Sequence, residues 1–418
     1  MLSEKSGLLD EIRGRFAHVD TCPFEGPRVF FENAGGALTL NSVVETSAKF
    51  AAIPDNQGRD NPAAHALVAL IDKAKADMRL FFNAPKGQFF VGESGTELLF
   101  RLIRTAIVGT GAGRVLGSTL EHPASRSAAA HWAEVAGKPH ILVAHDDTTG
   151  TVGPEAYRPE ITPDTRVATI LHTSPVTGMG VDVGAIAAEI RKIAPDCIII
   201  VDGIQHAAHG RLDIESYDVD GYVISPYKVF SRHGYGVAWV SDRLHAIKHE
   251  HLIDAPGNPW EFGTRDTGAY VTFSDVVNYF VWLGGEVSNQ TDPRARIVAA
   301  GEAIHAHEKH LTDAMINGIG NIKGLKDMAE VDIIGGLENP AREGLVCLTV
   351  KGQAAPYIVT KLRERGIRTH TRKADHYSGN VLSPLGLDAA VRVSMCHYNT
   401  ETEVAQFLTA MREIVEGV

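Results

Sequence analysis

The chain has 418 residues, more than one hydrophobic core usually supports, so a typical domain size of about 150 residues predicts two or three domains. Its 40 Lys and Arg and 51 Asp and Glu give a net charge of −11 with both signs interspersed, which argues against a nucleic-acid-binding or polybasic membrane protein. Hydrophobic residues make up 44% and charged residues 22%, values typical of a chain that folds throughout.

The sequence carries no sign of a targeting or membrane segment. Its first residues mix acids and bases, and the most apolar short run, 197–201, is far below the roughly 20 residues that a membrane span needs. The four cysteines are widely spaced and form no CxxC pair, so we expect buried free thiols. We therefore expect a cytoplasmic protein without a membrane partner.

Short β-branched runs alternate with amphipathic segments through the middle of the chain, the pattern of a parallel sheet covered by helices on both faces. The expected strands are residues 114–117, 140–143, 166–171, 197–201, 221–224 and 236–240. Ile186, Ile190 and Ile193 recur at helical spacing, which predicts a crossover helix over 183–193. We assign a large α/β domain to residues 29–285, preceded by an arm, 1–28, that packs on the second domain.

The pattern changes after about residue 285, where longer helices and fewer strands predict a smaller α+β domain, 286–418. Its expected elements are a helix at 294–316, strands at 332–334 and 345–350, a helix at 355–365, a strand at 391–394 and a helix at 400–415. No internal repeat or flexible linker separates the two domains, so we expect them to pack closely.

Two charged residues follow neighbouring strands of the large domain. Asp202 ends an apolar strand, which places its carboxylate in the ligand crevice of a doubly wound sheet, and Lys228 follows the next strand. These are the groups that pyridoxal 5'-phosphate (PLP) needs, an amine that forms a Schiff base and an acid beside the ring nitrogen. Alone, either residue has a structural interpretation, a turn aspartate or a surface lysine; their order and spacing favour the cofactor.

Further residues suit the same cofactor. Gly95 and Thr96 open an apolar-striped helix whose first amides could hold a phosphate, although a plain helix cap is the alternative. Ser225, just before Lys228, is another candidate phosphate contact. His122 could stack on a ring or move a proton, although a lone histidine is more often structural.

Four segments together, VDGIQ, SPYK, FGTRDTG and RVSMCHYNTETEV, give the chain a clear family resemblance. Over nearly its whole length it resembles the aminotransferase class V family of PLP enzymes, which includes cysteine desulfurases, selenocysteine lyases, kynureninase and isopenicillin-N epimerase. The resemblance implies the fold type I architecture, a mostly parallel seven-stranded sheet with helices on both faces plus a smaller C-terminal α+β domain.

The resemblance also implies roles for individual residues. Lys228 would form the Schiff base, Asp202 would pair with the ring nitrogen, Gln205 would bond the phenolic oxygen, and His122 would stack on the ring. The implied phosphate contacts are Gly95, Thr96, Ser225 and Tyr227, with Gly263 and Thr264 reaching the partner subunit's cofactor in a homodimer. The implied substrate contacts are Arg392, which would grip the α-carboxylate, Asn33 and Ala34, with Arg59 as a weaker match.

Two positions depart from the family pattern. Cysteine desulfurases carry a nucleophilic cysteine on a loop before the arginine strand, but the corresponding segment, 369–382, contains none, and Cys396 lies beyond Arg392 in an expected strand. A desulfurase that forms a persulfide is therefore disfavoured. Pro175 stands where many relatives have an asparagine that contacts the cofactor oxygen, and proline has no N–H to donate.

The segment that we expect as a loop, 369–382, instead offers cations and proton carriers. These are His370, Arg372, Lys373, His376 and Tyr377. They could attract an acidic side chain of the substrate, with His376 or Tyr377 in acid–base steps; the alternative is a solvated loop.

The predicted function is catalysis on a small α-amino acid through Lys228, first as a lyase that removes a β-substituent or β-carbon group without a persulfide. Aminotransferase or racemase activity is the alternative, and a non-catalytic PLP-binding protein is the remote one. No metal is expected, because the histidine groups 245–251 and 305–310 lack the HExxH pattern.

Overall fold

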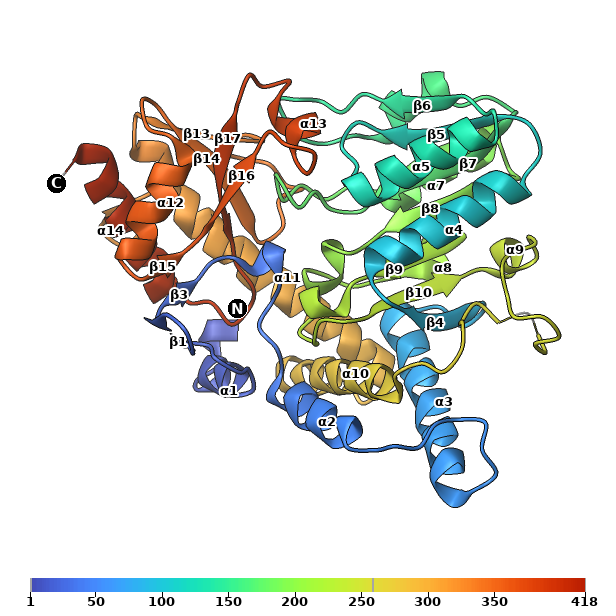
Figure 1. Cartoon of the computed structure of the whole chain (residues 1–418). Coiled ribbons are helices and arrows are strands. Elements are labelled where there is room, and N and C mark those ends of the chain that lie inside the picture. The colour runs from blue at the N-terminus through green and yellow to red at the C-terminus, as the bar shows by residue number, and fades with distance from the viewer. Residues whose placement is uncertain (1, 258, 418) are drawn as a thin grey trace.

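The computed structural model describes residues 2–257 and 259–417 and divides them between a large α/β body and a smaller α+β body (Figure 1). The large body is built on a seven-stranded sheet in the order β4-β10-β9-β8-β7-β5-β6. Its strands are β4 (Gln88–Gly92), β5 (Arg114–Ser118), β6 (His140–Val143), β7 (Thr165–Leu171), β8 (Ile198–Asp202), β9 (Gly221–Ile224) and β10 (Gly236–Val240).

This sheet confirms the predicted fold class. Neighbouring strands are parallel except that β10 runs antiparallel to both β9 and β4. All six predicted strands are present, and β4 is the one that the sequence did not reveal. Its apolar run is only Phe89 to Val91, too short to show a period.

The sheet is buried on both faces, which explains why its strands are continuous apolar runs. On β8, Ile198 and Ile200 pack in the cluster that includes helices α4 (Gly95–Gly109) and α5 (Pro123–Val135). Ile199 and Val201 point to the other face and join a second cluster with α7 (Val183–Ile193) and α10 (Thr267–Val287). Successive side chains of a strand alternate between faces, so both sets must be apolar.

The remaining elements of the first 292 residues surround this core. The helices are α1 (Leu8–Gly14), α2 (Asn41–Ala51), α3 (Pro62–Phe82), α6 (Pro154–Tyr157), α8 (Ile214–Tyr217) and α9 (Asp242–His245). The short strands are β1 (Thr21–Cys22), β2 (Gly26–Pro27) and β3 (Val29–Phe30). Arg13 of α1 donates to the Tyr398 carbonyl at 2.6 Å, and Lys5 pairs with Glu286 near the end of α10, so the N-terminal arm touches both bodies.

The small body has a four-stranded antiparallel sheet in the order β13-β14-β17-β16, with helices against it. The strands are β13 (Val331–Ile333), β14 (Leu345–Val350), β16 (His370–Lys373) and β17 (Ala389–Ser394), with a separate hairpin of β11 (Gly318–Ile319) and β12 (Ile322–Lys323), and β15 (Ile367–Arg368) beside β3. The helices are α11 (Pro293–Asn317), α12 (Ala355–Glu364), α13 (Gly379–Leu382) and α14 (Glu401–Glu416).

The predicted elements of this body are all present, but the expected loop 369–382 is partly wrong. Its first residues form β16, which pairs with β17 so that His370 lies opposite Arg392. The strand is hard to recognise because His370–Lys373 is polar throughout, and polar strands carry no apolar alternation. Cys396 is also not in a strand, since β17 ends at Ser394. In the described part of the chain, no helix has the length and apolar character to cross a membrane.

Candidate active site

The predicted cofactor residues meet at the carboxyl edge of the large sheet. Asp202 ends β8, and Lys228 ends the 3₁₀ turn Pro226–Lys228 that follows β9. The carboxyl ends of parallel strands lie at one edge, so these side chains converge. They line an inner chamber together with Thr96, His122, Gln205, Ser225 and Tyr227.

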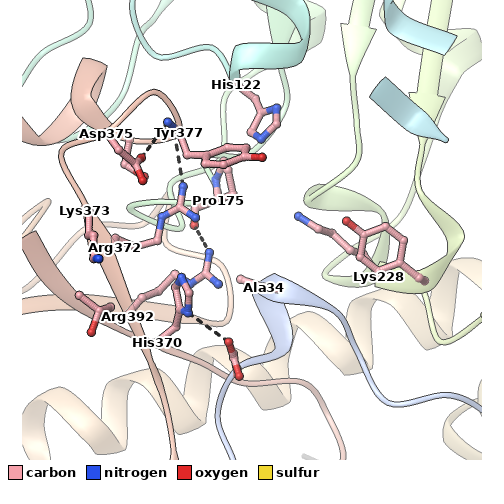
Figure 2. A pocket seen from close by; sticks show the side chains of 15 residues that line it. Ala34, His122, Pro175, Lys228, His370, Arg372, Lys373, Asp375, Tyr377 and Arg392 are labelled. Carbon is pink, nitrogen blue, oxygen red and sulfur yellow. Dashed lines mark hydrogen bonds and ion pairs between the residues drawn. The ribbon is translucent and has the colours of Figure 1, made fainter. Parts of the chain in front are cut away.

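The inner chamber opens into an outer cleft of about 570 Å³ between the two bodies. Figure 2 shows His370, Arg372 and Arg392 projecting from the small body toward Lys228 and His122 of the large body. A small molecule in this cleft would therefore contact both bodies at once.

Asp202 is a buried carboxylate with spare hydrogen-bonding capacity. Its Oδ1 accepts from the Ile204 amide at 3.1 Å, and Oδ2 has a long bond from Ser125 Oγ at 3.5 Å. Burial raises the pKa of Asp202 to about 6, against the opposing effects of the Ile204 amide and the Lys228 charge. A further cationic N–H donor in the chamber would stabilise its ionised form.

Lys228 has the character of a nucleophile. Burial, assisted by the charge of Arg392, lowers the pKa of its amine to about 7, although Asp202 acts in the opposite direction. Its Nζ donates to Gln205 Oε1 at 3.1 Å. Near neutral pH a substantial fraction of this amine is unprotonated, as attack on a carbonyl carbon requires.

His122 is held neutral at the mouth of the inner chamber. Its Nδ1 accepts from the Ala124 amide at 3.2 Å and caps α5, which leaves the proton of the neutral ring on Nε2. Burial and the charge of Lys228 lower the pKa of His122 to about 3. The ring is therefore a flat neutral surface rather than a cation.

The start of α4 fits a phosphate group. Ser94 Oγ caps the helix by accepting from the Glu97 amide at 3.1 Å, while the first amides of the helix have no intrahelical partner. A Cβ at Gly95 would lie 2.4 Å from Ser225 Oγ, so only glycine permits this close approach. Thr96 and Ser225 hydroxyls line the same space, and the residues present therefore fit the phosphate end of PLP.

Arg392 is a buried cation poised over the cleft. It is 2% exposed, its Nη1 donates to the Pro175 carbonyl at 2.8 Å, and its Nε has no partner among the described residues. Burial, together with repulsion from Arg372, lowers the pKa of Arg392 to about 9. Such a guanidinium favours a carboxylate ligand, because the negative charge of the ligand would offset both the burial of the guanidinium and its repulsion from Arg372.

The predicted cationic cluster divides into paired and unpaired members. His370 pairs with Glu32 Oε1 at 3.1 Å, and Arg368 takes the other oxygen of that carboxylate at 2.7 Å. Arg372 has a 3.4 Å bond to the Tyr377 carbonyl, and in the described ranges no carboxylate oxygen lies within 4 Å of it. Burial lowers the pKa of the Arg372 guanidinium. Lys373 and Tyr377 also line the cleft.

Of the remaining predicted site residues, one lines the cleft and the others lie outside it. Ala34 lines the cleft, but the Asn33 side chain is buried and bonds the Ser394 carbonyl at 2.9 Å, so it holds the segment rather than facing a ligand. Arg59 is exposed in the α2–α3 connection, outside both chambers. His376 packs against Tyr377 with the two rings tilted by 41° and their centroids 4.1 Å apart, and it does not line the cleft.

Gly263 and Thr264 are exposed on the segment before α10 and do not reach either chamber of their own chain. Two acidic residues that the sequence did not indicate lie at or near the site. Glu32 lines the outer cleft. Glu121, next to His122 in the sequence, is buried outside the lining of both chambers and accepts from the Ser118 amide at 3.0 Å. Burial raises the pKa of Glu121 to about 7. The one feature of the sequence that could have indicated Glu121 is its position next to His122.

Comparison with known proteins gives a family match. The family model for aminotransferase class-V matches residues 29–407. The nonribosomal peptide synthetase-like enzyme fsqF of Aspergillus fumigatus is 27% identical over 414 residues, which cover 92% of this chain and 26% of that protein, so this chain spans about a quarter of it. The cysteine desulfurase-like protein ustD of Aspergillus flavus is 26% identical over 413 residues, covering 93% of this chain and 88% of ustD.

The fold has close counterparts among solved structures. The cysteine desulfurase CsdA from Escherichia coli superposes with a TM-score of 0.79 at 20% identity, covering 98% of this chain and 99% of CsdA. At this identity the likeness concerns the fold alone.

Proposed function

Since the chain belongs to the aminotransferase class-V family, whose members are PLP-dependent enzymes, we propose that it binds PLP in the inner chamber and acts on a small α-amino acid. The observation that carries this proposal is the Lys228 amine, whose pKa burial lowers to about 7, facing the same chamber as buried Asp202. The Gly95–Ser225 contact supplies a fitting site for the phosphate.

When bound, PLP supplies an electron sink that stabilises negative charge at the substrate α-carbon. The chain's own residues have separate tasks. Lys228 holds the cofactor and moves a proton at the α-carbon, while Asp202 keeps a proton on the ring nitrogen. His122 packs its neutral ring at the chamber mouth, and Arg392 orients the substrate through its α-carboxylate.

The reaction that we propose is loss of a group from the substrate β-carbon without a cysteine acceptor. Residues 369–382 contain no cysteine, and all four cysteines of the chain are buried away from the outer cleft. A persulfide would need an accessible thiolate beside the substrate. The leaving group must therefore depart as a free species.

The substrate class follows from the charge of the outer cleft. Arg392 and Arg372 both face it and both are without a carboxylate partner in the described residues, whereas His370 is already paired with Glu32. One α-carboxylate can satisfy one guanidinium. A substrate with a second acidic group, a carboxylate or a sulfinate, would satisfy the other, and its loss would release CO2 or sulfite.

The cofactor proposal is tested by visible absorbance. Purified protein with added PLP should show the absorption of a protein-bound Schiff base, and Lys228→Ala should abolish it. A colourless wild-type protein that ignores added PLP would contradict the proposal.

The reaction is tested with a panel of cysteine, cysteine sulfinate, aspartate and alanine, assayed for sulfide, sulfite, CO2 and keto acid. We expect Arg372→Gln to lower kcat/KM for the two acidic substrates by about 10- to 150-fold, since a hydrogen bond to a charged group contributes about 1.5–3 kcal/mol, and to leave kcat/KM for alanine unchanged. Lys326→Gln, an exposed lysine of the small body that lines neither chamber, is the control. Products limited to a keto acid and a transferred amine would indicate an aminotransferase instead.

We also propose that the protein is a homodimer in which Gly263 and Thr264 contact the partner subunit's cofactor phosphate. Their exposure and their distance from their own inner chamber support this. Light scattering should give a dimer mass, and Thr264→Ala should weaken PLP binding. A monomeric protein with full PLP affinity would contradict it.

A further inference from the structure

A buried hydrogen-bonded chain leads from Lys228 across to the small body. Lys228 Nζ donates to Gln205 Oε1 at 3.1 Å, and Gln205 Nε2 lies 3.2 Å from His209 Nε2. The other ring nitrogen, His209 Nδ1, lies 2.7 Å from Glu308 Oε2 on α11. Gln205 and His209 are four residues apart, which brings them to one side of a helical turn.

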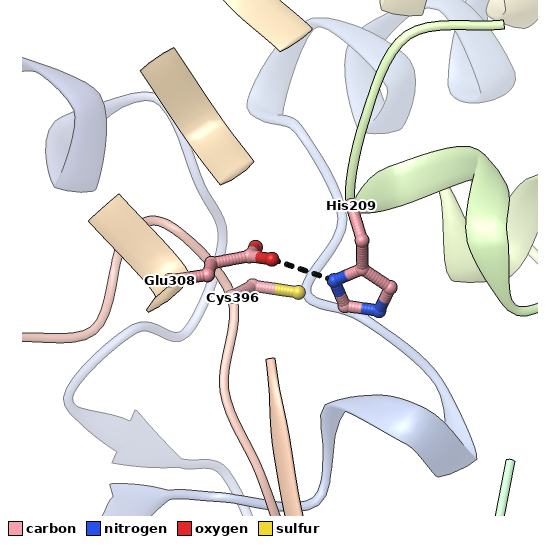
Figure 3. A group of neighbouring side chains, drawn as sticks. All are labelled: His209, Glu308 and Cys396. Carbon is pink, nitrogen blue, oxygen red and sulfur yellow. Dashed lines mark hydrogen bonds and ion pairs between the residues drawn. The ribbon is translucent and has the colours of Figure 1, made fainter. Parts of the chain in front are cut away.

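The hydrogen-bonded series that starts at Lys228 ends in a compact cluster of three buried groups, His209, Glu308 and Cys396. Their polar atoms lie within 4.8 Å of one another (Figure 3). The His209 ring points straight at the Glu308 carboxylate, with the Cys396 sulfur alongside. Burial of an ion pair of this kind requires that every proton have an acceptor. The direction of each hydrogen bond is therefore fixed by where the protons of His209 lie.

Burial raises the pKa of Glu308, although the charge of His209 and the hydrogen bond to it act in the opposite direction. With Glu308 ionised, its carboxylate accepts, so His209 Nδ1 carries a proton and the protonation of His209 Nε2 is the one that varies. If Nε2 is unprotonated, it accepts from the Gln205 amide nitrogen, and the amide oxygen remains for the Lys228 ammonium, as observed. If Nε2 is protonated, two donors face each other. The Gln205 amide must then turn over, and its NH2 group faces Lys228.

The charges around His209 make the protonated form accessible. Burial lowers the pKa of His209, but the charge of Glu308 and the hydrogen bond to it outweigh burial, so the net pKa is raised. Glu343 acts in the same direction and Lys228 in the opposite one. His397 and Cys396 also face this group. A Lys228 ammonium favours neutral His209 because it claims the amide oxygen.

We propose that His209 and Glu308 are positioning residues that set the orientation of the Gln205 amide: when Lys228 Nζ becomes bound to the cofactor, His209 takes up a proton and the amide turns its NH2 toward the cofactor. This inference rests on the proposed function. The turned amide donates to an anionic oxygen in the inner chamber, a contact that Pro175 on the same wall has no N–H to make.

The test is proton uptake when PLP binds the cofactor-free, full-length protein. Titration calorimetry in two buffers of different ionisation enthalpy gives the number of protons exchanged. We expect the wild type to take up about one proton more than Glu308→Gln, in which the neutral amide no longer favours a charged His209. Gln205→Leu should show the same loss with the His209–Glu308 pair intact, so the result does not depend on one variant folding. Cys396→Ala touches the same cluster but not the amide, and should match the wild type.

A second measurement follows His209 directly in the wild-type protein. In ¹⁵N-histidine-labelled protein, the His209 Nε2 signal should move from that of a neutral ring to that of an imidazolium when PLP is added. Absence of PLP binding would defeat the proposed function. PLP binding with equal proton uptake in wild type and Glu308→Gln, or with an unchanged His209 signal, would defeat this inference alone. A stoichiometric metal ion that Cys396→Ala releases would also defeat it, because the cluster would then be a metal site.

Discussion

Replacing Lys228 with methionine should stabilise the cofactor-free protein at neutral pH. Burial, helped by repulsion from Arg392, lowers the pKa of Lys228 from 10.5 to about 7. Between these two values the unfolded chain holds a proton that the folded chain does not, so stability rises with pH across this window. Below pH 7 the folded protein carries the full cost of the buried charge. The difference of about 3.5 pH units, at about 1.4 kcal/mol each, is about 5 kcal/mol.

Two effects reduce this figure. Lys228 is partly exposed to the outer cleft, where water screens its charge, and methionine loses the bond to Gln205, worth about 1 kcal/mol. We therefore expect Lys228→Met to gain about 2 to 4 kcal/mol at pH 6, and the gain to vanish near pH 10.5.

Urea unfolding followed by tryptophan fluorescence between pH 6 and 10 measures this gain. Lys138→Met is the matched control, because Lys138 Nζ donates to the Ile107 carbonyl at 2.6 Å and to Thr110 O and Oγ1 at 3.0 and 2.8 Å. That variant should lose stability. A Lys228→Met protein less stable than wild type at pH 6, or a difference that does not change with pH, would refute the reasoning.

Three further variants test the site. Gly95→Ala places a Cβ 2.4 Å from Ser225 Oγ and should weaken PLP binding tenfold or more in a fluorescence titration; unchanged affinity would count against the phosphate site. Arg392→Lys should raise KM by about 10- to 100-fold with a smaller effect on kcat, because a lysine lacks the bidentate fork; steady-state kinetics with unchanged KM would contradict this. Gly344→Ala combines a φ of +48° with a Cβ 3.0 Å from His209 Nδ1, and should cost about 1–2 kcal/mol of unfolding free energy. Equal midpoints in urea would contradict that last expectation.

The core of the site was predictable from the sequence because it depends on strand ends. Asp202 and Lys228 directly follow apolar runs, and the geometry of parallel strands alone brings such positions together. The same rule predicted the architecture of the large body. The bond from the Asn33 side chain to the Ser394 carbonyl could not be predicted, because it joins segments that are distant in the sequence.

Ion pairing between distant segments could not be predicted. Glu32 pairs with His370 and Arg368 and leaves Arg372 without a carboxylate, although all three residues lie close together in the sequence. The partner of His209 is on α11, almost a hundred residues away. Neither the pairing of Glu32 nor that of His209 leaves a local sequence pattern, because both depend on how the small body packs on the large one.

The bond between Arg392 and the Pro175 carbonyl joins the two bodies, because Arg392 belongs to β17 and Pro175 to the loop after β7. This bond uses only Nη1 of the guanidinium, and Nε has no partner among the described residues. A carboxylate can therefore bind the free part of the guanidinium while the Pro175 bond remains. The large body thus fixes the orientation of a guanidinium that the small body supplies, so the geometry of carboxylate recognition depends on how the two bodies are held together.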